Sequence, residues 1–426
     1  MRQSVRFALW LLLAACSMTS VAQAAGLIDR NAAARFGMTR AWFAQVGSPR
    51  ATGSISHIAY DHGTLLVQTA RGLLTALDGE TGRILWSTQA GPSDRMCTAP
   101  AANAQHVVVV NGSMLIVIER SSGSILWERQ LRGAPGAGPG VSATHAFVPM
   151  INGLVEGFDL SKGAKQTPWI YKSAGRVLVP PMATESNVSW TTDKGYFYVA
   201  NPSAQGIRYR LETRDAIHSQ PAYWTPNMYA GSMDGVVYAV NEGSGKIEWK
   251  HSTGDSILVS PVAIAGKVYV ISEQGGMYCL DGKDGTQLWF APKMRQFVSL
   301  SPSRVYASDE LGRLVALDAA SGTRLGAMPL NGVTMKLVNN HSDRVYLAND
   351  ACVIQCLRDI DAKSPTLYVP PPAEPQDDKS KPKLPADESK KDSTARPDAG
   401  AVEETDAAMP EENADAPAAD ADDPFK

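Results

Sequence analysis

Short apolar runs, rich in β-branched and aromatic residues, recur along most of the chain and are separated by clusters of glycine and aspartate. The stretch 256–292 contains four such runs in succession, namely SILVSPVAIAG, KVYVISEQ, GMYCLDGKDG and TQLWFAP. Apolar residues crowd the first two, as expected for strands buried on both faces, while the outermost run alternates more between apolar and polar residues. We therefore predict four short β-strands in this stretch, with Gly and Asp supplying the turns.

The same arrangement returns at a nearly constant spacing. A pattern G-x-x-x-A-x-D-x-x-x-G-x-x-x-W is clearest at 72–86, 235–249 and 275–289 and occurs seven times with decreasing fidelity. Its first glycines are separated by 40, 41, 42, 40, 40 and 37 residues and fall at Gly72, Gly112, Gly153, Gly195, Gly235, Gly275 and Gly312. Four short strands per unit, with Gly and Trp marking each unit, are typical of a β-propeller blade.

An eighth unit is incomplete. CVIQCLRDIDA, from Cys352, takes the frame of the other units, with Cys356 at the position of Ala76, but no tryptophan strand follows it. A matching strand occurs near the N-terminus, because AWFAQVG at 41–47 resembles LWSTQAG at 85–91. Building the last blade from both ends of the chain removes a free sheet edge. The predicted fold is thus an all-β, eight-bladed β-propeller with four-stranded blades, the last closed by an N-terminal strand.

The first 24 residues are typical of an export signal, with Arg2 and Arg6 ahead of an apolar run too short to span a bilayer. Two cleavage sites compete. VAQAA, ending at Ala25, offers a small-residue site that would release a soluble protein, whereas LAAC resembles a lipobox ending at Cys16. If the lipobox is used, Cys16 carries lipid and holds the protein on a membrane surface. We expect an exported protein in either case, located in the periplasm or at the outer membrane.

Three further segments follow the export signal. Residues 25–37 are predicted as a short helical lead-in, with Asp29 as N-cap and Gly37 just past its end. Residues 38–370 are predicted to form the propeller. Residues 371–426 hold 16 acidic and 7 basic residues, a net charge of −9 against −3 for the whole chain, and no aromatic residue before Phe425. Such an acidic, Pro- and Ala-rich tail cannot offset its ordering entropy by burial, so we expect it to be disordered.

The repeat resembles the pyrroloquinoline-quinone-type propeller repeat, which has the tryptophan-docking pattern A-x-D-x-x-T-G-x-x-x-W. Residues 76–86, ALDGETGRILW, match this pattern at every specified position. This resemblance implies that each docking Trp packs over the Gly-containing turn of a neighbouring blade. The matching positions are Trp42, Trp86, Trp127, Trp169, Trp249 and Trp289, with Gly82, Gly123, Gly245 and Gly285 as partners. The motif is interrupted where Arg210 and Gly326 take the Trp position and where two residues are inserted before Trp169.

Two kinds of protein share this repeat: quinoprotein dehydrogenases, which bind the quinone and calcium in the ring, and non-enzymatic relatives that include the BamB family of outer-membrane assembly lipoproteins. The dehydrogenases characteristically carry two adjacent cysteines over the cofactor and extended inserted loops. No two cysteines are adjacent here, and the units have almost no insertions. The resemblance therefore favours a protein that is not an enzyme and binds no cofactor.

Candidate chemistry is sparse. The seven histidines show no metal-ligand spacing such as H-x-x-x-H, so we predict no metal site. The acidic residues that recur once per unit are explained as turn residues that cap backbone N–H groups. They are Asp78, Glu119, Asp159, Asp281 and Asp318.

The four cysteines beyond Cys16 are expected to be buried free thiols. Cys352 and Cys356 would lie roughly 13 Å apart on one extended strand, too far for a disulfide. They could pair only if blade eight is irregular. Cys97 and Cys279 fall in blades two and six, on opposite sides of the predicted ring.

A rigid ring without a cluster of catalytic or metal-binding residues favours a non-enzymatic protein-binding scaffold of the cell envelope. Outer-membrane protein assembly is its candidate role. Its predicted partners are other envelope or outer-membrane proteins, and a membrane surface if a lipid anchor is present. Basic patches with interleaved aromatic residues are absent from the sequence, which argues against a nucleic-acid partner. The alternatives are a quinone-dependent dehydrogenase and a ligand-binding sensor that uses the propeller channel.

Overall fold

The computed structural model describes residues 26–202 and 206–372. The predicted export signal, with Cys16, and the predicted acidic tail beyond residue 372 lie outside the described residues.

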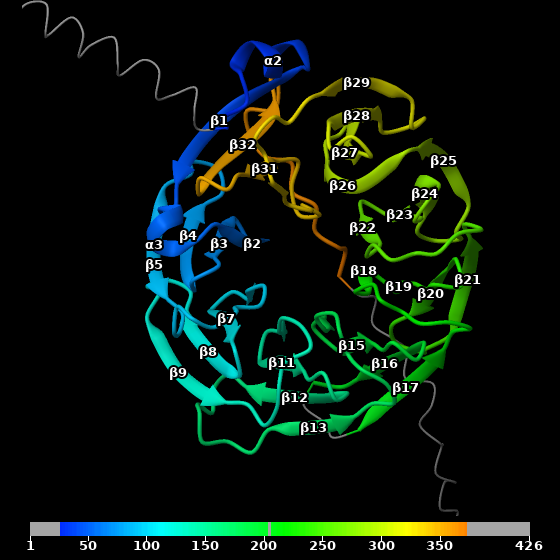
Figure 1. Ribbon diagram of the computed structural model, residues 1–426. Helices are drawn as coiled ribbons and strands as arrows, with labels where there is room; N and C mark the ends of the chain where they lie inside the picture. The colour runs from blue at the N-terminus through cyan, green and yellow to red at the C-terminus, as the bar shows by residue number, and fades with distance from the viewer. Residues whose placement is uncertain (1–25, 203–205, 373–426) are drawn as a thin grey trace, which may run out of the picture. The chain divides into compact units, whose positions relative to one another are not determined.

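Eight four-stranded antiparallel sheets surround a central axis, each forming one blade of a ring (Figure 1). In every blade the strands run from the innermost to the outermost position. Blades one to four consist of β2 (Ile55–Asp61), β3 (Thr64–Thr69), β4 (Leu73–Asp78) and β5 (Ile84–Gln89); β6 (Ala101–Ala102), β7 (His106–Asn111), β8 (Met114–Glu119) and β9 (Ile125–Gln130); β10 (Gly140–Val141), β11 (His145–Pro149), β12 (Leu154–Asp159) and β13 (Trp169–Lys172); and β14 (Met182–Ala183), β15 (Val188–Thr191), β16 (Tyr196–Ala200) and β17 (Ile207–Glu212).

The remaining blades repeat this order. Blades five to eight consist of β18 (Ala222–Trp224), β19 (Asn227–Gly231), β20 (Val236–Asn241) and β21 (Ile247–Ser252); β22 (Val262–Ile264), β23 (Lys267–Ile271), β24 (Gly276–Asp281) and β25 (Gln287–Pro292); β26 (Met294–Leu300), β27 (Arg304–Asp309), β28 (Leu314–Asp318) and β29 (Arg324–Met328); and β30 (Met335–Lys336), β31 (Val345–Ala348), β32 (Val353–Asp359) and β1 (Met38–Gln45).

The eighth blade closes the ring with the N-terminal strand. β1 pairs antiparallel with β32 and places Trp42 opposite Cys356, as other blades place Trp86 opposite Ala76 (Figure 1). The predicted fold is therefore confirmed, including closure by the N-terminal strand. Because both ends of the propeller chain meet in one sheet, neither end leaves an unpaired strand at the seam.

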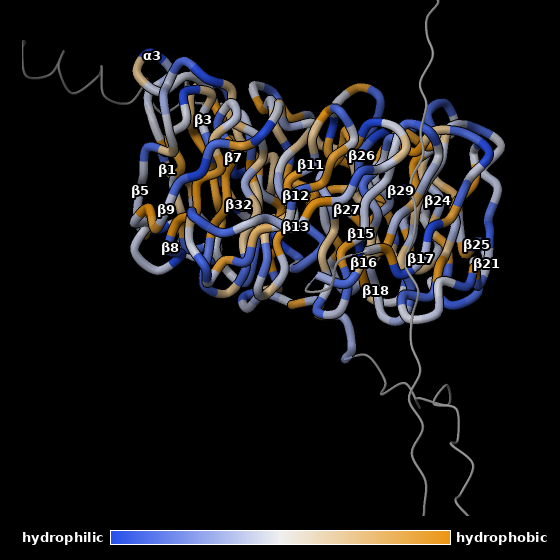
Figure 2. Tube along the Cα trace, turned by 90° about the horizontal axis from the view of Figure 1, so that it is seen from below, coloured by the Kyte–Doolittle hydropathy of each residue, from blue (hydrophilic) through white to orange (hydrophobic). Residues whose placement is uncertain are grey.

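The hydrophobic core lies between the blades. Each junction holds one cluster of buried side chains from the facing sheets, for example Leu66 and Trp86 of blade one with Val107 and Ile116 of blade two. Strands of the second and third positions are buried on both faces, which explains their continuous apolar sequences. Apolar residues predominate in the middle of the blades, and polar residues predominate along the two rims of the ring (Figure 2).

Docking of a tryptophan on the turn of the next blade is present at four junctions. The pairs are Trp42 with Gly82, Trp86 with Gly123, Trp249 with Gly285, and Trp289 with Gly322. In each pair a Cβ added to the glycine would lie 2.4–2.6 Å from the indole, so only glycine lets the ring approach this closely. Each indole N–H also donates to a backbone carbonyl of the same turn, as from Trp42 Nε1 to Gly79 O at 2.9 Å.

The other predicted docking positions need correction. The Trp position of blade four is Tyr209, not Arg210, because Tyr209 lies opposite Val199 and its ring covers Gly245. Trp127 does not dock on a turn glycine of blade three. Its indole N–H has no hydrogen-bond partner in the described residues, and no atom lies within 4 Å of a Cβ built on Gly163, the glycine of the lengthened turn in blade three.

Trp169 also packs differently from the motif. Its indole lies edge-on to Trp190 of blade four, with ring centroids 6.0 Å apart, instead of covering a turn glycine. At the junction of blades seven and eight, the ring of Phe36 lies 3.6 Å from a Cβ built on Gly326 and takes the place of the absent tryptophan.

Phe36 is delivered by the helical lead-in. Helix α2 (Arg30–Arg35) begins after Asp29, whose carboxylate accepts the Ala32 N–H at 2.9 Å, and ends at Phe36, followed by Gly37 with φ +80°. A second helix, α3 (Pro49–Thr52), follows β1. Neither helix is long or apolar enough to cross a membrane, and the described residues contain no other that is.

Candidate partner-binding face

The ring has two loop-bearing sides of different construction. We call one the connector face: it carries the links between successive blades and the turns between the second and third strands of each blade. The opposite side, the turn face, carries the remaining turns, including those beneath the docked indoles. Helix α3 lies in a link between blades and marks the connector face, which forms the upper rim in Figure 2.

Backbone hydrogen bonds fix the loops of the connector face. In seven blades, an amide of the turn between the second and third strands donates to a carbonyl of the link that enters the blade, at 2.8–3.1 Å. The donors and acceptors are Arg71 and Thr52, Gly112 and Met96, Ile151 and Ala134, Asp193 and Arg176, Met233 and Ala216, Glu273 and Ser256, and Glu310 and Lys293. The loops are therefore pre-organised, which lowers the entropic cost of binding a partner.

Large apolar side chains point into solvent from these fixed loops. Met96, in the link to blade two, is 86% exposed, and Leu311, in a turn of blade seven, is 69% exposed. Ile151 in blade three and Leu258 and Val259 in the link to blade six are also exposed. Methionine is enriched at protein interfaces because its flexible thioether adapts to irregular surfaces. These residues give the connector face the means to bury apolar area against a partner.

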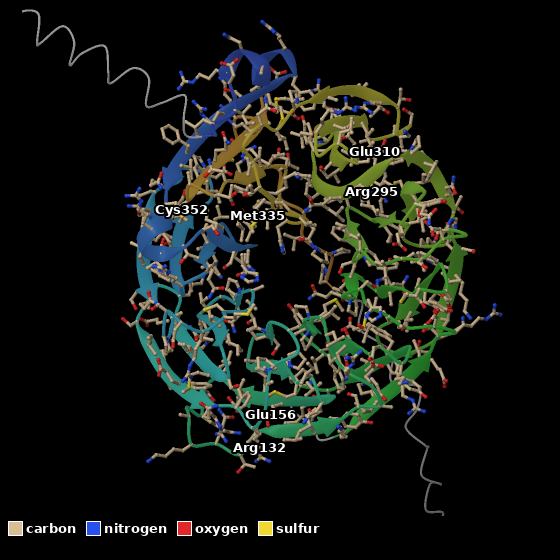
Figure 3. All side chains as sticks on the ribbon, viewed as in Figure 1. Arg132, Glu156, Arg295, Glu310, Met335 and Cys352 are labelled. Atoms are coloured by element: carbon tan, nitrogen blue, oxygen red, sulfur yellow. The ribbon has the colours of Figure 1, made fainter. Side chains whose placement is uncertain are left out.

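Exposed arginines accompany the apolar residues on this face. Arg176 Nε lies 2.7 Å from a carboxylate oxygen of Asp193. Burial acts to raise the pKa of Asp193, but the hydrogen bonds from Arg176 outweigh it, so the pKa lies below its ordinary value. Arg295 donates to the Glu273 carbonyl, beside the ion pair of Lys293 and Glu310 (Figure 3). Arginine combines charge with planar hydrogen-bonding geometry and is common at interface hot spots.

One carboxylate of blade three is buried with an incomplete set of partners. Glu156 is 1% exposed, and its Oε1 accepts no hydrogen bond within the described residues. The nearest cation is Arg132, whose Nε lies 3.7 Å away (Figure 3). Burial raises the pKa of Glu156 more than Arg132 and Arg129 lower it.

The recurring acidic residues end the third strands of their blades and do not form a common site. The four aspartates accept backbone N–H groups of the following turn, as predicted, whereas Glu119 accepts from the Ser122 hydroxyl. The Asp78 carboxylate accepts the Thr81 N–H at 2.8 Å, and Asp318 accepts the Ser321 N–H at 2.8 Å. Across the described ranges, no three His, Cys, Asp or Glu side chains gather in a way that could hold a metal ion.

The predicted cysteine state is confirmed for the described part of the chain: Cys97, Cys279, Cys352 and Cys356 are buried and unpaired. The predicted placement of Cys352 on a strand is wrong. It lies in the turn before β32 with φ +61°, at a position where several other blades have glycine. Burial raises the pKa of the Cys279 thiol to about 11, so it is protonated at neutral pH.

The residues of the connector face were missed by sequence reasoning, which singled out the tryptophans and glycines of the turn side. Met96 and Arg176 stand in links whose lengths vary, outside the repeated motif. A signal was nevertheless present, because an apolar residue such as Met96 or Leu311 within a polar loop is not explained by the repeat.

Comparison with solved structures shows the same architecture. BamB from Moraxella catarrhalis superposes with a TM-score of 0.61 at 17% sequence identity, covering 75% of this chain and 99% of that one. The computationally designed Ika8 protein gives 0.58 at 14% identity, covering 73% and 98%. The C-terminal WD40 domain of Sif2 gives 0.56 at 12% identity, covering 74% and 98%. At these identities the similarity shows the fold alone.

Comparison of sequences identifies the family. No curated protein matches the chain significantly. A family model described as outer membrane protein assembly factor BamB, in contrast, matches residues 34–167 and 189–356, which together form most of the chain. The matched ranges extend from the helical lead-in into β32 and include strands of all eight blades, while β13 of blade three and β14 of blade four lie between the two ranges. The chain therefore belongs to the BamB family of outer membrane protein assembly factors.

Proposed function

We propose that this protein is a non-enzymatic binding scaffold of the cell envelope, which engages an outer-membrane protein assembly partner through its connector face. The observation that carries the proposal is the family match over residues 34–167 and 189–356. The rigid loops with exposed Met96 and Leu311 support it, because pre-organised loops lower the entropic cost of binding and these side chains can bury apolar area against a partner. The export signal expected at the N-terminus also supports it, because export would bring the protein into the same compartment as such partners.

Co-purification of substituted proteins tests the proposal. Tagged wild-type protein, Met96→Asp, Leu311→Asp and the control Lys283→Asp, whose site lies on the turn face, are expressed in the native host and recovered from solubilised envelopes. Both apolar residues are exposed, so their replacement is not expected to alter folding. We expect an outer-membrane assembly protein, identified by mass spectrometry, to be recovered with the wild type and Lys283→Asp. Its recovery should fall with Met96→Asp or Leu311→Asp, and equal recovery with all four proteins contradicts the proposed face.

The enzymatic alternative is tested separately with the purified protein. We propose that the chain binds no quinone, so adding pyrroloquinoline quinone and calcium should leave the absorption spectrum equal to the sum of the components. A shifted quinone band that saturates with protein concentration would instead support a dehydrogenase.

A further inference from the structure

The inner wall of the ring contains a hollow of about 530 Å³ formed chiefly by blades eight, one and two. Its walls include Ile58, Pro100, Met335 and Lys336, and Gln220, in the link that enters blade five, also lines it. Met335 lies at the inner edge of blade eight, beside the opening of the ring (Figure 3). A hollow of this size is large enough for a small organic molecule.

Lys336 breaks the repeat at this wall. Strand register identifies the equivalents of Lys336 in the other blades. The next residue, Leu337, pairs with Tyr346, and Tyr346 lies opposite Cys356. In blade six the corresponding pair is Tyr269 opposite Cys279, so the equivalent of Lys336 is the residue before the one that pairs with Tyr269. In each of the other seven blades, the residue that is equivalent to Lys336 is apolar. These residues are Ile58, Pro100, Pro139, Pro181, Pro221, Pro261 and Val298. A structural requirement shared by all blades therefore does not explain the lysine.

The ammonium group of Lys336 has no counter-ion among the residues that the structure describes. Within the described ranges it forms no ion pair, and its Nζ takes part in no hydrogen bond. Burial lowers the pKa of Lys336. The one acidic residue that lines the hollow, Asp61, is already paired with Arg120 and His62.

The rest of the lining combines apolar surface with amide groups. Val338 is 39% exposed within the wall, and Ile58 and Met335 add further apolar area. The side-chain amides of Gln220 and Asn340 form no hydrogen bonds within the part of the chain that the structure describes. As far as the described residues go, the lining thus presents one unpaired cation, two free amides and an apolar surface to a ligand.

From this geometry we infer that the hollow binds a small amphiphilic carboxylate, whose head group pairs with Lys336 and whose apolar chain lies against Ile58, Met335 and Val338. A carboxylate supplies the negatively charged partner that the ammonium group lacks. Charge-assisted hydrogen bonds are stronger where water is partly excluded. The apolar chain fills a wall that is otherwise exposed to water. This site is separate from the connector face and does not depend on the protein partner proposed above.

Titration calorimetry with decanoate, below its micelle-forming concentration, tests the inference. The proteins are the full chain as wild type, Lys336→Met, and Lys246→Met, which removes an exposed lysine elsewhere. We expect saturable binding to the wild type and to Lys246→Met, and about tenfold to a hundredfold weaker binding to Lys336→Met, from the loss of one charged hydrogen bond. Equal affinity of Lys336→Met, or no binding to the wild type, overturns the inference.

Two controls keep the result interpretable. Seven blades have an apolar residue at the equivalent position, so Lys336→Met should fold, and its thermal midpoint without ligand should equal or exceed that of the wild type. Decyltrimethylammonium, with the same chain and the opposite charge, should not bind. If it binds as tightly as decanoate, the hollow recognises only apolar chains and the role of Lys336 is refuted.

Discussion

Substitution of Gly82 by alanine should destabilise the ring more than the same substitution at Gly163. Both glycines stand in the turn between the third and fourth strands of a blade, and both have φ +70°. A Cβ at Gly82 would lie 2.4 Å from Cδ2 and Cε3 of Trp42, whereas a Cβ at Gly163 meets nothing within 4 Å. The pair isolates the effect of the docked indole from the effect of the backbone conformation.

The magnitudes follow from these two contributions. Alanine in the left-handed region costs about 1–2 kcal/mol at either position. At Gly82 the indole must also move, which costs about 1–3 kcal/mol for overpacking, and its hydrogen bond to Gly79, now 2.9 Å long, is worth about 0.5–1.5 kcal/mol. We expect Gly82→Ala to lower the free energy of unfolding by about 3–6 kcal/mol, against about 1–2 kcal/mol for Gly163→Ala.

Urea unfolding followed by circular dichroism measures both values. A double-mutant cycle with Trp42→Ala gives a second test, because without the indole Gly82→Ala should cost no more than Gly163→Ala. Equal costs of the two alanine substitutions in the wild-type background would refute the reasoning that Trp42 docks on Gly82 and seals the closing junction.

Three further substitutions test other parts of the chain. Phe36→Ala should lower the free energy of unfolding by about 2 kcal/mol, because it removes the ring that covers Gly326; an unchanged urea midpoint contradicts this. Since burial raises the folded-state pKa of Glu156, stability falls as pH rises through the window between the ordinary and raised pKa. Glu156→Gln should therefore be more stable relative to wild type at pH 7 than at pH 4, and a pH-independent difference refutes the raised pKa. If Cys16 is lipidated, Cys16→Ser should abolish membrane partitioning and the added mass; a soluble wild type that begins near Ala25 shows the alternative cleavage.

The fold could be predicted from the sequence because the repeated units can be aligned with one another. Each unit places its Gly and Trp at nearly constant spacing, so an unmatched strand at one end and an incomplete unit at the other identify the closing blade. Trp42 falls opposite Cys356 in β32 because both belong to the same repeat frame. Long-range pairing was thus inferred from local pattern, which is uncommon for strands more than 300 residues apart in sequence.

The errors lie where the repeat is irregular. The spacing from Gly72 to Trp86, applied from Gly195, leads to Tyr209, so the repeat itself indicates Tyr209 and not Arg210 as the docking position. Tyrosine serves because its ring covers Gly245 and its hydroxyl donates to the Glu242 carbonyl at 2.7 Å.

Other contacts were beyond the reach of the repeat. Phe36 precedes the first strand, and no motif indicates that it covers Gly326 in a blade nearly 300 residues away. The innermost strands are only two or three residues long in most blades and follow links of varying length, so their alignment requires the observed register. The place of Lys336 in the channel wall therefore became visible only in the structure.

The connector face is tested most directly by site-specific photocrosslinking in living cells of the native host. A photoreactive amino acid is placed at Met96 or Leu311 on the connector face, or at Lys283 on the turn face, and the adducts are identified by mass spectrometry. The account predicts adducts with an outer-membrane assembly protein from Met96 or Leu311 and none from Lys283. Adducts with that protein from Lys283 alone would contradict the assignment of the binding face, and no such adduct from any position would contradict the scaffold function.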